Sequence, residues 1–516
     1  MSQQNDAFKK LVAHCKEYGF IFPSSEVYDG LSAVYDYGPY GVELKNNIKE
    51  YWWRSMVQMH ENIVGIDAAI FMHPKTWKAS GHVDAFNDPL VDNKDSKKRY
   101  RADVLIEEYM DKIEGKINKE VEKAQKRFGD TFDEAMYRST NPRVTEYQQQ
   151  FDTIKTRLAT AMSQGDMAAL KTLIEELEIA DPDTGSRNWT EVRQFNLMFS
   201  TQLGNIAGEE GKLYLRPETA QGIFVNFLNV QKSTRQKVPF GIAQIGKAFR
   251  NEIVARQFIF RMREFEQMEM QFFIPPGTQK DWFDYWKDMR RKWHLALGTP
   301  ASKLRFHKHE NLAHYADAAE DIQFEFPFGF KELEGIHSRT DFDLGSHQEL
   351  SGKKMQYFDP ERNENYVPYV IETSIGCDRM FLAMMSHALT EETVPGSSDE
   401  GNTRDVLRLH PALAPVKAAI LPLKRNEDRL VGKAKDIFNQ LRLSFKVQYD
   451  DTGSIGKLYR RQDAIGTPYC ITVDFDTLED NTVTIRDRDT LVQDRVAIDR
   501  LEDIIRERVD MKQLFA

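Results

Sequence analysis

The feature that most constrains the fold is the alternation of residue types in "AFRNEIVARQFIFRMREFEQMEMQFF", residues 248–273. Met268, Met270 and Phe272 occupy every second position, and successive side chains of a strand point to opposite faces of a sheet. We predict two strands, "FGIAQIGKAFRNE" and "FRMREFEQMEMQFF", joined by the loop "IVARQFI". Such a hairpin belongs in an antiparallel sheet that turns one face towards a hydrophobic core.

The other face of this hairpin is polar and rich in arginine. Its predicted members are Arg250, Glu252, Arg261, Arg263, Phe265, Gln267 and Glu269, and the loop adds Arg256. A guanidinium group binds phosphate oxygens through two parallel hydrogen bonds, and an aromatic ring can stack on a purine. The pattern therefore favours a nucleotide site. The alternative is a solvated strand face with cross-strand ion pairs.

A strand followed by a helix is predicted at "YVIETSIGCDRMFLAMM", residues 369–385. Glu372, Ser374 and Gly376 fall on one face of the strand, and Arg379 falls in the first turn of the helix. The helix dipole disfavours a cation at this end unless an anion is bound. Arg379 is therefore a candidate ligand for a terminal phosphate, and the alternative is an ion pair with Asp378 or another acid.

Two further segments place charged residues near turns. "LYLRPETAQGIFVNFL", residues 213–228, offers Arg216 and Glu218 at a turn that enters a helix. "FKELEGIHSRTDFDLGSH", residues 330–347, carries the acids Glu332, Glu334, Asp341 and Asp343. Carboxylates can bind Mg²⁺ together with substrate phosphates, and the alternative is a set of solvated turn residues.

Helical stripes appear in two other regions. Leu44, Ile48, Trp52 and Met56 recur at every fourth position and predict a helix that starts near Gly41. The charged region from about 100 to 180 carries three such stripes, formed by Leu105, Tyr109, Ile113, Ile117 and Val121, by Phe151, Ile154, Leu158 and Met162, and by residues 167–177 after the capping candidate Asp166. The last hundred or so residues alternate strand and helix patterns, which predicts a small α/β domain.

Bulk composition limits the functional classes. A chain of 516 residues is too long for one core and predicts roughly two to four domains. The net charge of −10 argues against broad nucleic-acid affinity but not against a local basic surface. No apolar run reaches membrane length and no secretory pattern is visible, so no membrane partner is expected. Cys15, Cys377 and Cys470 are far apart, and we expect a reduced, cytoplasmic protein.

Several of these segments match a known family. "FRNE" with the returning "RMREF", and "GCDR" at the start of a helix, resemble motifs two and three of class II aminoacyl-tRNA synthetases. "DYGPYG" resembles motif one, which builds the dimer interface in that class. "RPETAQGIFVNF", "ELEGIHSRTDFDL" and "RYRADVLIE" are similar to glycyl-tRNA synthetases of the homodimeric type, and "SIGKLYRRQDAIGTPYCITVD" resembles an anticodon-binding domain. The resemblance covers nearly the whole chain.

The resemblance implies an α+β fold in which helices flank an antiparallel sheet. It divides the chain into the first part of the catalytic domain (1–99), a mostly helical insertion (100–188), the second part of the catalytic domain (189–405) and an α/β anticodon-binding domain (406–516). The implied reaction is ATP-dependent activation of glycine to glycyl-adenylate, followed by transfer of glycine to the 3′ end of tRNA(Gly). ATP with Mg²⁺ is then a substrate, and the implied partners are glycine, tRNA(Gly) and a second copy of the chain.

The resemblance also implies roles for single residues in ATP binding. Arg250 contacts the α-phosphate and the glycine carboxylate, Arg379 holds the γ-phosphate, and Phe265 stacks on adenine beside Glu252. Arg250 and Arg379 are the implied catalytic residues, and Glu332 is the implied Mg²⁺ ligand. The implied ATP contacts are Arg250, Asn251, Glu252, Phe260, Arg261, Met262, Arg263, Glu264, Phe265, Glu332, Leu333, Gly376, Cys377, Asp378 and Arg379.

Glycine offers no side chain, so a selective site must bind its ammonium and carboxylate groups and fill the space that any Cβ needs. Glu218, Glu269 and Glu372 match the acidic pocket of the family, and Ser374 completes it. The implied glycine contacts are Arg101, Glu218, Phe265, Glu266, Gln267, Met268, Glu269, Arg339, Glu372, Thr373, Ser374, Ile375 and Gly376.

One stretch departs from the family, and three rival interpretations remain. Bacterial relatives often carry cysteines before "RYRAD", whereas "LVDNKDSKKRYRAD" has none, so no zinc is expected. The first rival is a threonine, proline or serine enzyme of the same class, against which the pocket glutamates argue. The second is a non-catalytic relative such as a mitochondrial DNA polymerase accessory subunit, against which Arg250, Glu252 and Arg379 argue. The third is a ligase with a non-tRNA substrate, against which the C-terminal domain argues.

Overall fold

The computed structural model describes residues 2–204, 211–253, 257–309, 312, 316–393 and 403–515, so that Arg256 lies outside the described residues. The chain forms two compact units. The first comprises Met1–Ser80, Ser200–Arg250 and Arg256–Ala516, and the second comprises Gly81–Phe199 and Asn251–Ala255. Within the described part of the chain, no helix combines the length and the apolar character needed to cross a bilayer.

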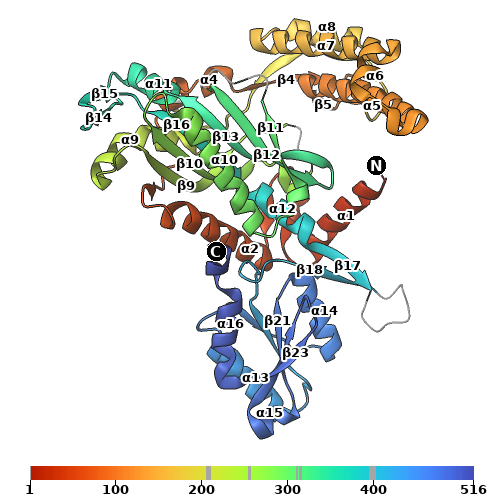
Figure 1. Ribbon diagram of the computed structural model, residues 1–516, viewed down its shortest axis with the longest axis vertical. Helices are drawn as coiled ribbons and strands as arrows, with labels where there is room; N and C mark the ends of the chain where they lie inside the picture. The colour runs from red at the N-terminus through yellow and green to blue at the C-terminus, as the bar shows by residue number, and fades with distance from the viewer. Residues whose placement is uncertain are drawn as a thin grey trace. The chain divides into compact units, whose positions relative to one another are not determined.

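A seven-stranded sheet forms the centre of the first unit (Figure 1). Its strands lie in the order β11-β12-β13-β16-β10-β9-β3, and all neighbours pair antiparallel except β3 and β9. The strands are β3 (Ile63–Gly65), β9 (Phe240–Phe249), β10 (Glu264–Ile274), β11 (Leu304–Lys308), β12 (Ala318–Phe326), β13 (Gly329–Thr340) and β16 (Tyr369–Gly376). The predicted antiparallel sheet is therefore present, with one parallel strand at its edge.

The predicted arginine hairpin has shorter strands and a longer loop than its alternation indicated. β9 ends at Phe249 and β10 begins at Glu264, so Arg250, Arg261 and Arg263 lie in the connection and not on the strands. The prediction that these arginines share a strand face is therefore wrong.

The backbone hydrogen bonds of the connection explain where the strands stop. The Arg250 N–H still donates to the Arg263 carbonyl (2.9 Å), but the Arg263 N–H donates to Ala33 (2.9 Å) and leaves the ladder. Ala33 lies in the turn between β1 (Ile21–Pro23) and β2 (Tyr35–Tyr37). A tertiary contact thus replaces strand pairing.

One face of the large sheet carries the main core. Met268, Met270 and Phe272 of β10 are buried there, as predicted. The helices on this face are α2 (Pro39–Trp53), extended by a π-helical turn at Arg54–Gln58, α10 (Gln279–Ala296) and α12 (Cys377–Ala388). The predicted stripe on α2 is confirmed, since Leu44, Ile48, Trp52 and Met56 are all buried in this core.

The opposite face of the sheet changes character along its strands. At one end Phe240, Ile242 and Phe273 pack against α9 (Ala220–Thr234). Farther along, the side chains on this face are polar, and these positions form the candidate site. The remaining elements of the first unit's core region are α1 (Ser2–Glu17), α3 (Pro74–Ala79), β7 (Ser200–Gln202), β8 (Lys212–Tyr214), α11 (Phe342–Ser351), β14 (Tyr357–Asp359), β15 (Glu364–Tyr366), β17 (Leu389–Thr393) and β18 (Thr403–Leu407).

The C-terminal part of the first unit is a separate five-stranded sheet with helices, as Figure 1 shows. Its strand order is β20-β19-β21-β22-β23, with β19 parallel to β20 and β21 and the other pairs antiparallel. The elements are β19 (Ala418–Pro422), α13 (Asp428–Leu441), β20 (Val447–Tyr449), α14 (Ile455–Ile465), β21 (Tyr469–Val473), α15 (Phe475–Asp480), β22 (Thr482–Asp487), β23 (Gln493–Ala497) and α16 (Leu501–Val509). The predicted small α/β domain is confirmed.

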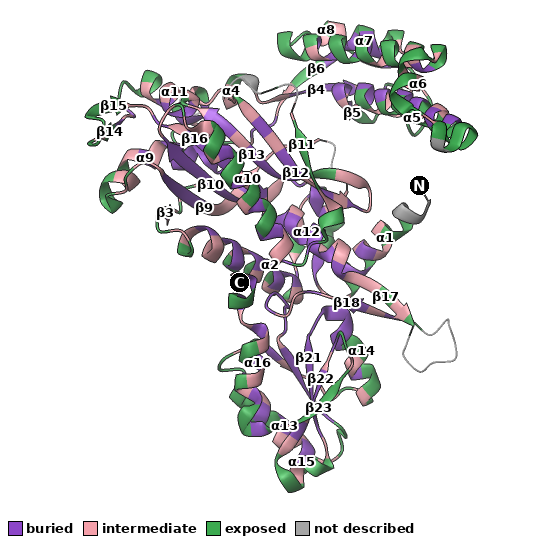
Figure 2. Ribbon diagram, viewed as in Figure 1, coloured by how far each residue is buried: buried purple, intermediate pink, exposed green. Residues whose placement is uncertain are grey.

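The second unit is mostly helical, with a small sheet in the order β5-β4-β6. Its elements are α4 (His82–Ala85), β4 (Asn87–Asp92), β5 (Arg99–Arg101), α5 (Ala102–Phe128), α6 (Glu134–Thr140), α7 (Pro142–Gln164), α8 (Met167–Glu176) and β6 (Arg193–Asn196). Buried and exposed residues alternate along α5 and α7 (Figure 2). The predicted stripes are buried except that Tyr109, Phe151, Met167 and Leu177 are only partly buried and Met162 is 38% exposed. The Asp166 carboxylate caps α8 by accepting from the Ala169 N–H (2.9 Å).

Candidate active site

The polar region of the large sheet collects side chains from four adjacent strands. Alternate residues of β9, β10, β13 and β16 point to this face, so positions far apart in sequence meet. The residues are Gln244, Gln267, Glu269, Gln271, His337, Arg339, Glu372 and Ser374. The pairing register places Glu269 opposite Ser374, and it places Gln271 and His337 on either side of Glu372.

Glu372 is a buried carboxylate with a full set of hydrogen-bond donors. Its Oε1 accepts from His337 Nδ1 (2.7 Å), and its Oε2 accepts from Arg339 Nη1 (2.9 Å) and Gln271 Nε2 (2.7 Å). Burial opposes ionisation of Glu372, yet the charge of Arg339 and the hydrogen bond from His337 lower its pKa overall. Glu372 is therefore ionised.

Glu269 lies beside Glu372 on the next strand but has weaker partners. It accepts hydrogen bonds from Gln271 Nε2 (2.9 Å) and the Thr219 hydroxyl, and it is only 2% exposed. Burial and the nearby charges of Glu372 and Glu218 raise the pKa of Glu269 well above its usual range. Of this coupled pair, Glu269 is the residue that keeps a proton, and an added cation would favour its ionisation.

A hydrogen-bonded chain connects this pair to the start of α9. Arg339 donates from Nε and Nη2 to the two oxygens of Asp343 (2.8 and 3.0 Å) while it also holds Glu372. Gln221 Nε2 donates to Asp343 (2.9 Å) and to Glu218 (3.1 Å). The result is a buried or half-buried region in which carboxylates outnumber guanidinium groups.

A bulge in β13 decides which acids face the site. Ile322 pairs with Glu334 and Gln323 pairs with Glu332, so Leu333 is an extra residue in the ladder. The bulge separates Glu332 from Glu334, which is fully buried at the α10 face, where Arg290 Nη2 (3.3 Å) and His294 Nε2 (2.7 Å) contact it. Among the described residues, no group of three or more histidines, cysteines and acids is arranged to hold a metal ion.

Arg379, in the first turn of α12, forms an ion pair with an acid. Its Nη1 lies 3.1 Å from the Glu332 carboxylate, and its Nε donates to the Phe260 carbonyl (3.2 Å). The guanidinium carbon is 4.4 Å from the centre of the Phe260 ring, and its charge is the main cause of the lowered pKa of Glu332. The partner is thus Glu332, whereas Asp378 accepts from Lys45 Nζ (2.9 Å).

Arg250 lies where β9 ends, next to the turn that begins α9. Its Nε donates to the Pro217 carbonyl (3.0 Å), and its guanidinium carbon is 5.3 Å from the centre of the Phe265 ring. These contacts bring Arg250, Phe265 and the Pro217–Glu218 turn together at one end of the polar region.

The other predicted residues of the connection and of β10 have varied contacts. Arg263 Nη1 donates to the Ser32 carbonyl (3.1 Å), and Glu264 pairs with Lys247 (2.8 Å). The Arg261 backbone ends the 3₁₀ turn at Phe258–Phe260. The remaining contacts are those of Gln267, whose amide binds the Thr219 N–H and the Ser374 hydroxyl, and of Gly376, the N-cap residue of α12.

Several predicted site residues turn their side chains away from the polar face. Glu266 lies 3.1 Å from Lys45 and 3.3 Å from Lys49, both on α2. The side chains of Met262, Met268, Leu333, Ile375 and Cys377 pack in the main core, and Thr373 is also buried. Only backbone atoms of these residues are available to a ligand on the polar face.

Arg101, Asn251 and Glu252 belong to the second unit. Arg101 pairs with Asp88 (3.0 Å) and Asp103 (2.6 Å). Burial opposes its charge, but the hydrogen bonds that it donates to Asp103 and the negative charges around it, including that of Glu252, raise the pKa of Arg101 overall.

Sequence reasoning missed three residues that hold the site together, and it gave a fourth another role. Gln271 and His337 stand two positions from the predicted Glu269 and Arg339, so strand periodicity alone could have placed both on the polar face. Thr219 carried no such signal, because its role depends on how α9 meets the sheet. Asp343 was noted only as one acid of a possible Mg²⁺ site, and in the structure it binds Arg339.

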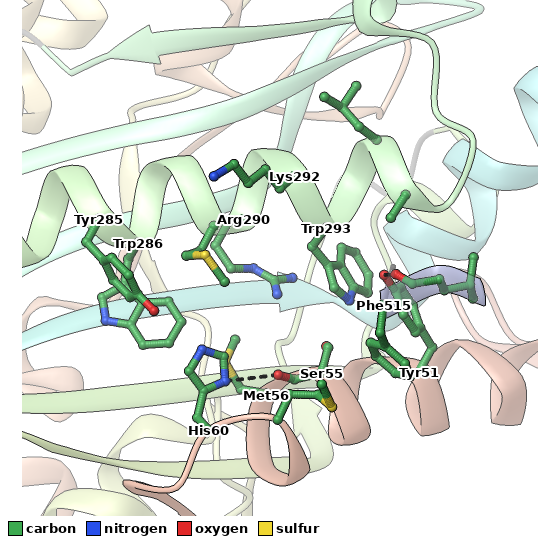
Figure 3. Close-up of a pocket in the computed structure, with 15 residues that line it drawn as sticks. Tyr51, Ser55, Met56, His60, Tyr285, Trp286, Arg290, Lys292, Trp293 and Phe515 are labelled. Carbon is green, nitrogen blue, oxygen red and sulfur yellow. Dashed lines mark hydrogen bonds between the residues drawn. The ribbon is translucent and has the colours of Figure 1, made fainter. Parts of the chain in front are cut away.

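A pocket of about 780 Å³ opens on the core side, between α2 with its π-helical extension, α10 and the C-terminal residues (Figure 3). Tyr51, Met56, Trp286 and Trp293 give it a largely apolar lining, and Phe515 closes one end. This pocket contains none of the predicted site residues.

Three family models match the chain. They describe a tRNA synthetase class II core domain for glycine, histidine, proline, serine and threonine (residues 203–388), a glycyl-tRNA synthetase insertion domain (88–197) and an anticodon binding domain (417–508). A solved structure of Giardia lamblia prolyl-tRNA synthetase in complex with prolyl-adenylate aligns with a TM-score of 0.59 at 16% identity, over 99% of this chain and 80% of that one. The predicted α+β fold class is confirmed.

Curated relatives match over nearly their full length. The glycine–tRNA ligase of Chlorobaculum tepidum is 53% identical over 96% of this chain and 98% of its own. That of Staphylococcus haemolyticus is 50% identical over 97% of this chain and 98% of its own. Identity at this level across all the described elements shows that the chain belongs to the glycine–tRNA ligase family of class II aminoacyl-tRNA synthetases.

Proposed function

We propose that this chain activates glycine with ATP and transfers it to the 3′ end of tRNA(Gly). The observation that carries the proposal is the cluster of carboxylates formed by the buried Glu269 and Glu372 and the half-buried Glu218, next to the turn that Arg250 contacts. The names of the curated relatives agree with it.

The carboxylates are suited to an ammonium group. Arg339 is bound to Asp343 and Glu372, and its charge also acts on Glu218 and Glu269, so one guanidinium group serves four carboxylates. A buried excess of negative charge is unfavourable unless a cation or a proton compensates it. Burial and the neighbouring carboxylates raise the pKa of Glu269, which favours a proton as the compensating charge in the free protein. A substrate ammonium can take the place of that proton.

The phosphate groups of ATP are assigned to Arg250 and Arg379, which are both partly exposed. Arg250 is proposed to bind the α-phosphate and the glycine carboxylate, Arg379 the γ-phosphate, and Phe265 the adenine ring. The glycine carboxylate attacks the α-phosphorus and pyrophosphate leaves; the tRNA 3′-hydroxyl then attacks the glycyl carbonyl and AMP leaves. This chemistry needs positioning and charge neutralisation more than a protein nucleophile.

Mg²⁺ is proposed to arrive with ATP. Glu332 is half exposed and ionised beside Arg379, and a single carboxylate together with substrate phosphates suits this ion. Zinc is not part of the proposal. The predicted roles of Arg101, Asn251 and Glu252 also remain proposals.

The C-terminal domain is proposed to bind the anticodon arm. The face of α14 that includes Lys457, Arg460 and Arg461 is exposed, whereas Leu458 is buried. Unstacked loop bases and backbone phosphates can be recognised by such a basic face. We keep 1–99, 100–188, 189–405 and 406–516 as the proposed domain boundaries.

Two further properties complete the proposal, namely a homodimer and a cytoplasmic location. The apolar pocket between α2 and α10 is bordered by Met59 (57% exposed), and the β1–β2 turn displays Val27 (88%) and Tyr28 (83%). Exposed apolar groups of this kind mark protein interfaces. The three cysteines are free and buried thiols, which supports a reducing compartment.

The test is amino-acid-dependent ATP–pyrophosphate exchange with all twenty amino acids in the absence of tRNA. Exchange with glycine alone is expected. Exchange with proline, serine or threonine would move the chain within its class, and a folded protein that exchanges with none would favour the non-catalytic interpretation.

A further inference from the structure

His337 is held rigidly against the carboxylate pocket. Its Nδ1 lies 2.7 Å from Glu372 Oε1, and the pairing register of β13 and β16 sets the two residues directly opposite each other. The ring packs over Gly335, where an added Cβ would come within 3.0 Å of ring atom Cε1. The His337 side chain is 20% exposed, so the ring can still exchange protons with solvent.

His337 and Arg339 serve Glu372 in different ways. Arg339 is permanently charged and is also bound to Asp343. His337 is the donor to Oε1 and can change its charge near neutral pH. Its Nδ1–H can donate to Glu372 in the neutral ring as well as in the charged one. Deprotonation therefore removes a positive charge without removing the hydrogen bond.

The charged and titratable groups around His337 come from every neighbouring strand. They are Glu372 on β16, Asp321 on β12, Arg339 and Glu332 on its own strand, and His309 after β11, whose ring centre is 6.1 Å away. His309 itself lies 2.8 Å from Asp321. Glu334, Arg290 and His294 lie on the opposite face of the sheet and do not contact the ring.

We propose that His337 is a positioning residue that sets the affinity of the site for glycine, because its imidazolium competes with the substrate ammonium for the charge of Glu372. The inference rests on the proposed function. When His337 is neutral, Glu372 keeps its position and its charge is available to the ammonium. When His337 is protonated, the imidazolium becomes a further cation, besides Arg339, with which the ammonium must share the charge of Glu372.

The sign of the effect follows from linkage. Two cations that repel each other lower each other's affinity, so glycine binding releases protons from His337 and glycine affinity rises with pH. Burial opposes the charge of His337, but the hydrogen bond and charge of Glu372 raise its pKa overall, which places the change above the ordinary histidine value of about 6.5. Loss of the Glu269 proton also raises glycine affinity as pH increases. The contribution of His337 must therefore be identified by comparing variants.

The experiment is glycine-dependent pyrophosphate exchange at saturating ATP from about pH 6 to about pH 9. His337→Gln keeps a neutral donor to Glu372, and His307→Gln changes an exposed histidine on β11 as the matched control. In wild type and in the control, KM for glycine is expected to fall as pH rises. The fall should exceed that in His337→Gln by about threefold to tenfold, since one pKa unit corresponds to a factor of ten. The pH profile of kcat should be the same in all three proteins. Parallel KM profiles in all three proteins overturn the proposal.

A measurement on the unmodified protein guards against a variant that folds poorly. Titration calorimetry of glycine binding near pH 7, in buffers of different ionisation enthalpy, is expected to show net proton release, and its absence overturns the proposal. If wild type exchanges with no amino acid at any pH, the proposed function itself fails. Exchange with glycine but without the His337-dependent pH difference leaves that function standing and removes only this inference.

Discussion

At the scale of single residues, the site depends on two neighbouring glutamates that differ in their donors. Glu372 has an arginine, a histidine and an amide, and it is ionised. Glu269 has a hydroxyl and an amide, and it keeps its proton. Desolvation acts on both, so the difference arises from which carboxylate the cations can reach.

The raised pKa of Glu269 predicts a dependence of stability on pH. Between the ordinary glutamate value of about 4.5 and the raised value, the folded state binds more protons than the unfolded state, so the free energy of unfolding falls as pH rises. Glu269→Gln removes this loss. The denaturation midpoint of Glu269→Gln minus that of wild type should therefore increase steadily as pH rises above about 4.5. The KM of this variant for glycine should also be higher than that of wild type. A difference between the two midpoints that stays constant with pH would contradict the assignment of the proton to Glu269.

Arg250 gives the second prediction at this scale. Arg250→Ala removes the group proposed to neutralise the α-phosphate, and pyrophosphate exchange should fall by on the order of 10² to 10³. Binding of tRNA should change little, because the proposed anticodon contacts lie on α14. Arg250→Lys should rescue only part of the rate, since lysine lacks the planar fork. Normal exchange in Arg250→Ala would remove this residue from the site.

Strand periodicity identified much of the polar face but not the side chains' final partners. It placed Glu269 on the polar face of one strand and Glu372 with Ser374 on one face of another, and the pairing of β10 with β16 brings the three together. The same alternation puts Glu266 on the other face, although the family resemblance implies a glycine contact for it, and its side chain meets two lysines of α2. Its partners are far away in sequence, and a local pattern contains no information on them.

At the scale of elements, β13 shows how one extra residue divides two acids. Without the bulge at Leu333, Glu332 and Glu334 would share a face. With it, Glu332 meets Arg379 and Glu334 joins a buried ion triad with Arg290 and His294. A bulge has no reliable sequence signature. The sequence therefore suggested that the acids of this stretch lie together, whereas the bulge sends Glu332 and Glu334 to opposite faces of the sheet.

The ion triad of Glu334, Arg290 and His294 predicts that a substitution outside the candidate active site lowers the free energy of unfolding strongly. Glu334→Ala leaves Arg290 buried without its partner and should cost about 3–5 kcal/mol, whereas the double change Arg290→Met with Glu334→Leu should recover most of that. Denaturation followed by the fluorescence of Trp286 and Trp293 measures it.

A matched control lies on the same helix. Lys287 pairs with Glu320 at a partly exposed position (2.7 Å), and Lys287→Met should cost less than about 1 kcal/mol. Equal losses for Glu334→Ala and Lys287→Met would mean that the triad adds nothing beyond an ordinary ion pair.

At the scale of the whole first unit, the C-terminal domain is tied back to the core. Arg404 of β18 contacts both Glu392 of β17 (2.8 Å) and Asp463 of α14. The Tyr51 hydroxyl donates to the Leu514 carbonyl (3.1 Å), and Leu514 packs in the main core. The α/β pattern of this domain was evident in the sequence, but these ties were not, because they join residues of different elements that are 12 to 463 positions apart.

These ties determine how the role of the domain in tRNA binding should be tested. Deleting everything after about residue 410 would strip Leu514 from the core and leave Arg404 without Asp463, so exchange should fall together with tRNA charging. Charge reversal of Lys457 and Arg460 on the exposed face of α14 leaves the ties in place. That variant should charge tRNA poorly, show weaker and less salt-dependent tRNA binding, and retain pyrophosphate exchange. The matching reversal of Lys433 and Lys435 on α13 controls for net charge. If both variants lose charging equally, a general electrostatic attraction explains tRNA binding better than a specific α14 contact does.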